Sequence, residues 1–95
     1  MDIWPPTKIQ KAVIASIDGC GGATPGNVGN ENTVGDFFPG STGLPASVKR
    51  CITNNIKARC RIKKFSWSGR LSTTLRELID SVRFYQKYYP VDATS

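Results

Sequence analysis

The stretch IKARCRIKKFSW, residues 56–67, alternates apolar and basic side chains over its first eight positions. The basic ones are Lys57, Arg59, Arg61 and Lys63, and the apolar ones are Ile56, Ala58, Cys60 and Ile62. At about 100° per residue a helix would scatter both sets around its surface, whereas successive side chains of a strand point to opposite faces. The alternation therefore predicts a half-buried strand with one basic face and one apolar face.

The end of this stretch departs from the alternation, because Lys63 and Lys64 follow each other directly. Phe65 and Trp67 remain on the apolar side only if the strand contains a bulge near Lys64. We expect both aromatic rings to lie in the core, with stacking on nucleic-acid bases as their alternative use.

A strand in water needs a partner strand. Residues 47–53, SVKRCIT, precede it, and the Asn54-Asn55 pair between them suits a tight turn because Asn tolerates positive φ. A hairpin is therefore one expectation for this region. Residues 47–53 alternatively form a short helix with one apolar side. If the chain has too few strands, pairing with a second copy would complete the sheet.

A helix is predicted near the N-terminus, over residues 7–19, TKIQKAVIASIDG. Ile9, Val13 and Ile17 are spaced i, i+4, i+8, two prolines precede the segment, and Gly19 ends it. The run KAVIASI is rich in β-branched residues, so a buried strand is the alternative.

The clearest helical pattern covers residues 74–89, TLRELIDSVRFYQKYY. Thr74 and Glu77 have the spacing of a capping box, and Pro90 ends the run. The apolar stripe consists of Leu75, Leu78, Ile79, Val82, Tyr85 and Tyr89. Phe84 and Tyr88 lie roughly opposite that stripe, so they require a second surface to cover them.

A long glycine-rich segment separates these elements. Eight of the nine glycines lie between Gly19 and Gly43, with few apolar residues among them. We expect residues 19–45 to form a flexible loop without regular structure, attached to the core through Phe37 and Phe38. The rest of the chain is expected to form one domain over residues 1–95, with 90–95 as a tail. The predicted fold class is α+β, with a short antiparallel sheet or hairpin whose basic face is exposed.

The charge of the chain is strongly uneven. The 95 residues carry a net charge of +6, and no acidic residue occurs from Phe37 to Leu75. The basic residues of that region are Lys49, Arg50, Lys57, Arg59, Arg61, Lys63, Lys64 and Arg70. Such a region attracts polyanions such as nucleic acid or anionic lipid, although a basic surface also keeps a protein in solution.

Three cysteines, Cys20, Cys51 and Cys60, show no zinc spacing, and the chain contains no His. The N-terminus shows no secretory pattern, and no segment is apolar enough for a membrane span. We therefore expect a soluble cytoplasmic protein with free thiols in a reducing compartment. A Cys51–Cys60 disulfide is the alternative if the protein is exported.

Known catalytic patterns are absent from the sequence. Without His, neither a Ser/His/Asp triad nor a Cys/His pair can form. The run GCGGATPGNVG matches neither a Walker loop nor a dinucleotide fingerprint. Glu31 and Asp36 are close enough in sequence to form a carboxylate pair, but a solvating role is the expected one. We expect no enzymatic activity, no cofactor, no metal site and no small-molecule substrate.

The sequence thus favours a small basic protein that binds RNA or DNA mainly through the phosphate backbone, the most direct use of its eight clustered cations. We expect a homodimer, with Phe84, Tyr88 and Trp67 available for base stacking or for an interface. A viral or phage accessory protein is one expected setting. The alternatives are a structural or adaptor protein with an acidic partner and, less favoured, a His-free RNase toxin.

Overall fold

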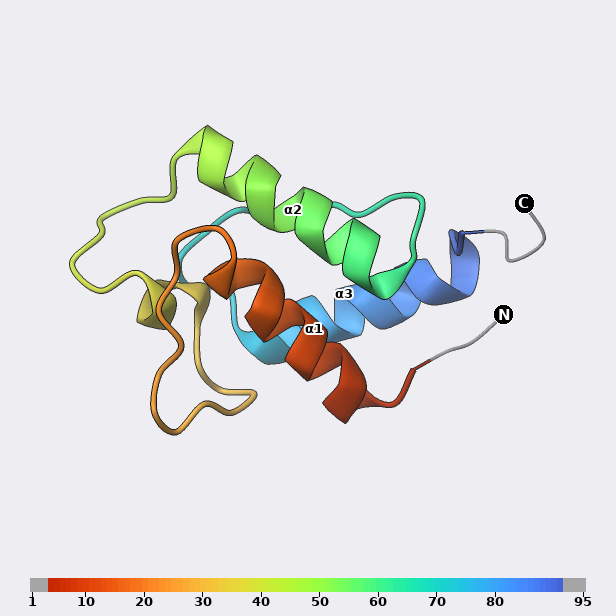
Figure 1. Cartoon of the computed structure of the whole chain (residues 1–95), viewed down its shortest axis with the longest axis horizontal. Coiled ribbons are helices and arrows are strands. Elements are labelled where there is room, and N and C mark those ends of the chain that lie inside the picture. The colour runs from red at the N-terminus through yellow and green to blue at the C-terminus, as the bar shows by residue number, and fades with distance from the viewer. Residues whose placement is uncertain (1–3, 92–95) are drawn as a thin grey trace.

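The structure of the protein, a computed structural model, describes residues 4–91 and contains three α-helices in this range. They are α1 (Pro6–Asp18), α2 (Ala46–Cys60) and α3 (Leu75–Tyr88), with a short 3-10 helix, η1 (Val34–Phe37), between α1 and α2. In Figure 1, α1 runs antiparallel to α2 and α3, so the C-terminal ends of α2 and α3 lie on the same side of the molecule.

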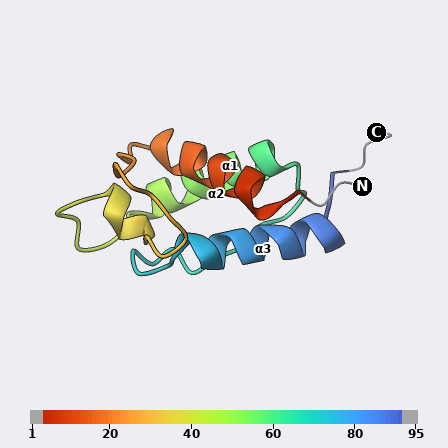
Figure 2. The same ribbon diagram turned by 90° about the horizontal axis from the view of Figure 1, so that it is seen from below.

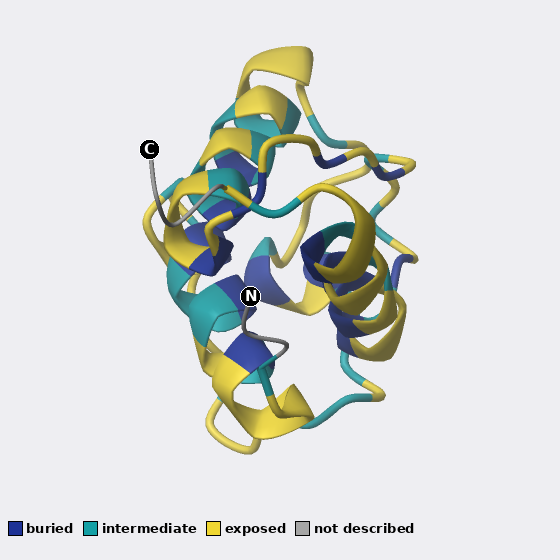
Figure 3. Cartoon of the chain, turned by 90° about the vertical axis from the view of Figure 1, so that its right-hand side faces the viewer, coloured by how far each residue is buried: buried dark blue, intermediate teal, exposed yellow. Residues whose placement is uncertain are grey.

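The helices form two layers. Figure 2 shows α1 and α2 side by side above α3. Helix α1 packs against both other helices, whereas α2 and α3 touch each other at few points. The buried residues lie on the faces that the helices turn toward one another, and the outer faces are exposed (Figure 3). Burial of this shared apolar core stabilises the arrangement.

The α1 helix confirms the prediction for the N-terminal segment. Pro5 is its N-cap residue and Gly19 its C-cap residue, and Ile9, Val13 and Ile17 are fully buried. The β-branched residues of this segment did not favour a strand, because the i, i+4, i+8 spacing of Ile9, Val13 and Ile17 places these three side chains in the core between the helices.

The α2 helix shows that the predicted strand over residues 56–63 is wrong. Ile52, Ile56 and Cys60 are its buried residues, and Ala58 is exposed. An alternation of period two also contains every fourth residue, so the spacing of Ile56 and Cys60 fits a helical stripe that begins at Ile52. Ala, Lys and Arg are all good helix formers, and they supply the intervening positions.

The predicted α+β class is therefore wrong, and the described part of the chain is all-helical without a sheet. Asn54 and Asn55 lie inside α2, so the hairpin does not form, and no strand exists that could contain a bulge at Lys64. Extended pairing within residues 4–91 is limited to two isolated bridges, Thr33 with Thr74 and Ile62 with Pro90.

The α3 helix begins as predicted. The Thr74 side chain accepts a hydrogen bond from the Glu77 N–H, and the Glu77 carboxylate accepts one from the Thr74 N–H, which completes the capping box. Leu75, Leu78, Ile79 and Val82 are buried, whereas Tyr89 lies past the helix end and is partly exposed.

Gln86 of α3 is buried although it is polar, which the apolar pattern did not indicate. Its side-chain oxygen accepts a hydrogen bond from the Trp4 N–H, and its nitrogen donates one to the Cys60 carbonyl at the end of α2. The Gln86 amide thus connects α3 to the end of α2 and to Trp4, just before α1. Both polar groups of the amide have a hydrogen-bond partner.

The segment between α2 and α3 fills the space that these two helices leave. Phe65 and Trp67 are buried, as predicted, although not on a strand. The Trp67 indole N–H donates to the Thr53 hydroxyl on α2 at 2.9 Å, and the Phe65 ring meets Tyr85 of α3 edge-on at 5.5 Å between centroids. These contacts join α2 to α3 through the connecting chain.

The glycine-rich segment contains η1, which the sequence did not indicate. Phe37 is almost fully buried and Phe38 packs against the core, so both anchor the segment as predicted. Residues 30–35 pair with residues 71–76 through backbone hydrogen bonds such as Val34 N–H to the Thr73 carbonyl. The flexibility expected for 19–45 stays a prediction, and most of the predicted 90–95 tail lies outside the described residues.

The cysteines differ from both sequence expectations. Cys20 and Cys51 form a disulfide that joins the end of α1 to α2, and Cys60 is a free, buried thiol. The free-thiol prediction for Cys20 and Cys51 and the alternative Cys51–Cys60 pairing are therefore wrong. Because disulfides persist in oxidising surroundings, this bond argues against a reducing compartment. Among the described residues, no helix combines the length and apolar character that a bilayer span requires.

Candidate anion-binding site

The helical conformation of residues 46–60 redistributes the alternating cations. Residues two positions apart on a helix differ by about 200°, so Lys57 and Arg59 point to different sides of α2. Lys57 and Arg61, the C-cap residue of α2, both border the same hollow. Lys63 and Lys64 follow α2 in the connecting segment and are exposed. We call Lys57, Arg61, Lys63 and Lys64 the basic end.

A hollow of about 430 Å³ lies at the basic end. It is lined by Asn54, Lys57, Ala58, Arg61, Ile62 and Val91. The cations of Lys57 and Arg61 and the side-chain amide of Asn54 thus border a hollow whose other lining residues are apolar. Lys63 and Lys64 lie within three residues of Arg61, a stretch of chain that spans at most about 11 Å. The hollow can therefore present several N–H donors and positive charges to one anion or to consecutive anionic groups.

Arg61 adopts an unusual backbone conformation. Its φ of 57° and ψ of 51° are left-handed, and no other non-glycine residue described has positive φ. This residue ends α2 at a position where Gly is usual. The Val91 N–H donates to the Arg61 carbonyl, and the Ile62 N–H donates to the Lys57 carbonyl, which together hold the turn. A left-handed Arg where Gly would cost less suggests a role for its side chain outside folding.

We expect Arg61→Gly to raise the free energy of unfolding by about 1 kcal/mol, because Gly adopts positive φ without a steric penalty. A thermal or urea melt checks this. The same variant should bind polyanions more weakly than the parent. A loss of stability of 1 kcal/mol or more would show instead that the Arg61 side chain supports the fold.

A second group of predicted binding residues lies near the start of α2. A hollow of about 380 Å³ is lined by Ala46, Lys49, Arg50, Thr53, Phe65, Ser66 and Trp67. The stem of Lys49 covers Gly69, where a Cβ would collide with it, and the exposed Arg70 follows in sequence. The eight predicted cations therefore divide among at least two surfaces, with Arg59 on another side of α2, so they do not form one face.

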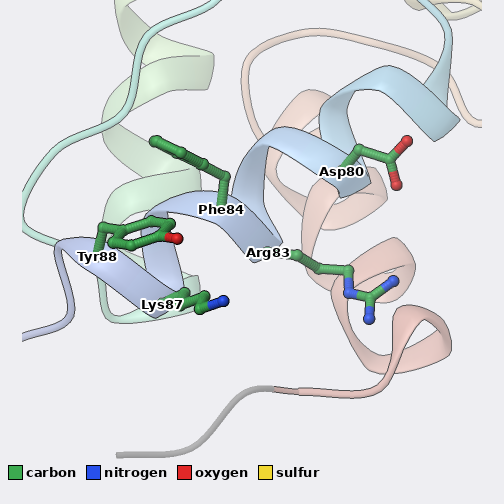
Figure 4. A pocket seen from close by; sticks show the side chains of 5 residues that line it. All are labelled: Asp80, Arg83, Phe84, Lys87 and Tyr88. Atoms are coloured by element: carbon green, nitrogen blue, oxygen red, sulfur yellow. The ribbon is translucent and has the colours of Figure 1, made fainter.

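The predicted stacking residues also separate. Trp67 is only 9% exposed, so its ring has no free face for a base. Phe84 and Tyr88 are 52% and 57% exposed and lie together on α3. Figure 4 shows them side by side, with Arg83 and Asp80 on the adjoining side of the helix and Lys87 between the two groups. These five residues line a hollow of about 490 Å³.

The charges of the basic end have no carboxylate partner among the described residues. The salt bridge found in residues 4–91 joins Arg76 to Glu31 at 2.8 Å and is exposed. Lys57 lies in the last turn of α2, where a cation also stabilises the helix dipole, but Lys63 and Lys64 lie beyond that turn. The dipole therefore explains only part of the accumulated charge.

The acidic residues singled out in the sequence have a local structural role. The Asp36 carboxylate accepts hydrogen bonds from the Asn32 side-chain amide and the Thr33 N–H, which lower its pKa. Glu31 forms a salt bridge with Arg76 and does not pair with Asp36. No group of three His, Cys, Asp or Glu residues suited to a metal ion is found within 4–91.

Comparisons with protein families, with curated proteins and with solved structures find no match to this chain. The function must therefore be inferred from the residues and their geometry. Sequence reasoning missed Asn54, Ile62 and Val91 as neighbours of the basic end, because only the helical turn at Arg61 and the Ile62–Pro90 bridge bring them together.

Proposed function

We propose that the protein binds nucleic acid through the phosphate backbone at its basic end. The observation that carries this proposal is the hollow bordered by Lys57 and Arg61, in a region without acidic residues from Phe37 to Leu75. Unneutralised cations repel one another, and a polyanion removes that repulsion while it releases counterions.

The spacing of the cations supports a chain of phosphates better than a single small anion. Lys57 lies in the last turn of α2 and Arg61 is the C-cap residue that ends this helix, and both line the same hollow. Two cations that line one hollow can contact consecutive phosphates of a strand. Lys63 and Lys64 extend the charge beyond the helix. Val91, which is 40% exposed, offers an apolar surface for a sugar beside the charged groups, whereas Ile62 is buried.

The disulfide sets a condition on this function. Cys51 lies in α2, so the Cys20–Cys51 bond fixes the helix that carries Lys57. The proposed partner would be met outside a reducing compartment. The expectations of a homodimer, of a viral or phage setting and of no enzymatic activity stay predictions.

The test compares two double variants that lower the net charge equally. Lys57→Gln/Arg61→Gln removes two cations from the basic end, and Lys8→Gln/Lys11→Gln removes two from the exposed face of α1. Fluorescence anisotropy with a labelled single-stranded oligonucleotide is measured over a range of NaCl concentrations. With four phosphates neutralised, the parent slope of log K against log salt should be about −3.

The first variant should flatten the slope by about 1.4 units, because it loses two of the four contacts. The matched control should keep the parent slope, since its cations lie outside the hollow. Equal slopes for both variants would contradict the site. Absence of binding by the parent at low salt would contradict the function and would leave the acidic-partner alternative.

A further inference from the structure

The exposed end of α3 carries an aromatic patch that the backbone-binding function does not use. It consists of Phe84, Tyr88 and Tyr89, of which Tyr89 is 40% exposed. The Phe84 and Tyr88 ring centroids lie 4.8 Å apart with a tilt of 48°. Rings exposed this far on a helix are costly in water unless a ligand covers them.

Further aromatic rings lie between the aromatic patch and the core. The Phe84 ring meets Tyr85 edge-on at 5.2 Å, and Tyr85 meets the buried Phe65 edge-on at 5.5 Å. A continuous series of ring contacts therefore connects the patch to the core. Since the rings are already positioned, a ligand that stacks on them loses little affinity to their ordering.

The aromatic patch is continuous with the basic end. The Lys63 N–H donates to the Tyr89 carbonyl, and the Lys64 ammonium lies 5.3 Å from the Tyr89 ring centroid. On the other side, the Lys87 ammonium lies 5.3 Å from the Tyr88 ring centroid. Val91, which lines the hollow beside Arg61, follows Tyr89 by two residues. One surface thus combines cations and exposed rings.

We infer that the partner is single-stranded, with bases stacked on Phe84 and Tyr88 while the basic end holds the backbone. This inference rests on the proposed function. In a duplex the flat faces of the bases are covered by their neighbours, so only the cations would be used. In a single strand the bases are free to stack on aromatic side chains, and the positive groove follows the phosphates.

A second copy of the chain fits the aromatic patch less well. Arg83, Lys87 and Lys64 lie beside the rings and Asp80 is the acidic residue of the same hollow, so a partner copy would bring three cations and one carboxylate to the contact. The area is also small. About half of each ring of Phe84 and Tyr88 is exposed, so together they offer about 200 Å², a quarter of one partner's share of a standard interface.

The test uses Phe84→Leu/Tyr88→Leu, which removes the rings but keeps apolar side chains. Affinity for a single-stranded oligonucleotide should fall at least about tenfold, because stacking is lost. The salt slope should stay at the parent value, since the cations are intact. Affinity for a duplex of the same length should change less than about twofold. Phe38→Leu, a half-buried ring outside the patch, is the control and should behave as the parent.

The outcomes separate this inference from the function on which it rests. If the parent binds with the expected salt slope but the double variant keeps full single-strand affinity, stacking is excluded and backbone binding stands. If the parent binds neither strand nor duplex, both proposals fail. A parent that light scattering shows to be a dimer, and that the double variant renders monomeric, would assign the rings to a subunit interface and overturn the inference.

Discussion

Replacing Cys20 and Cys51 by Ser is expected to lower the free energy of unfolding by about 3.7 kcal/mol. The disulfide closes a loop between residues separated by 31 positions, and this loop contains most of the glycines. Without the bond, the unfolded chain gains the conformational freedom that loop closure removes. For a domain of this size the loss is a large fraction of the total stability.

Urea melts of the parent and of the double variant, each with and without a thiol reductant, measure this effect. The reductant should lower the parent midpoint to that of the variant and should leave the variant unchanged. Burial raises the pKa of Cys60 to about 11, although the Arg59 charge acts in the opposite direction, so this thiol stays protonated and unreactive at neutral pH. A parent that is insensitive to reductant would contradict the Cys20–Cys51 assignment.

The second large effect concerns the helix that replaced the predicted strand. Ile56→Ala should lower the free energy of unfolding by about 2–5 kcal/mol, because Ile56 is fully buried. Ala58→Gln is the matched comparison. It should change stability by less than about 0.5 kcal/mol, since Ala58 is exposed on α2.

A strand would give a different result, because Ile56 and Ala58 would both face its apolar side. Comparable losses in the two variants would therefore contradict the helix. Circular dichroism of each variant before the melt establishes that it is folded, so that a difference in midpoint reports stability.

The sequence predicted α1 and α3, in which apolar residues at helical spacing lie between recognisable start and stop residues. In α3 the capping box and the spacing of the buried residues Leu75, Leu78 and Val82 indicate the same helix with the same start. In α2 the alternation over residues 56–63 was too short to distinguish period two from every fourth residue. Ile52 precedes Ile56 and Cys60 at the same four-residue spacing and would have indicated a helix. It lies, however, in residues 47–53, which the sequence analysis assigned to the first strand of a hairpin.

The sequence identified the cations of the candidate site, but it did not show how they are arranged on the surface of the molecule. Lys57 and Arg61 belong to the predicted group, yet Arg59 between them points elsewhere on the helix. The hollow depends on a left-handed Arg61 and on a contact with Val91, at 30 residues' distance in sequence. Local patterns carry little information about either feature. The exposure of Phe84 and Tyr88 was predictable, because both lie opposite the apolar stripe.

The most direct test of nucleic-acid binding at the basic end is a titration of the isotopically labelled protein with a short single-stranded oligonucleotide, followed by amide NMR spectra. The amides of residues 57–64 and 84–91 should shift together and should saturate at one concentration of ligand. The exposed face of α1, including Lys8 and Lys11, should shift little. Shifts concentrated on α1, or no saturable shifts at low salt, would contradict the account.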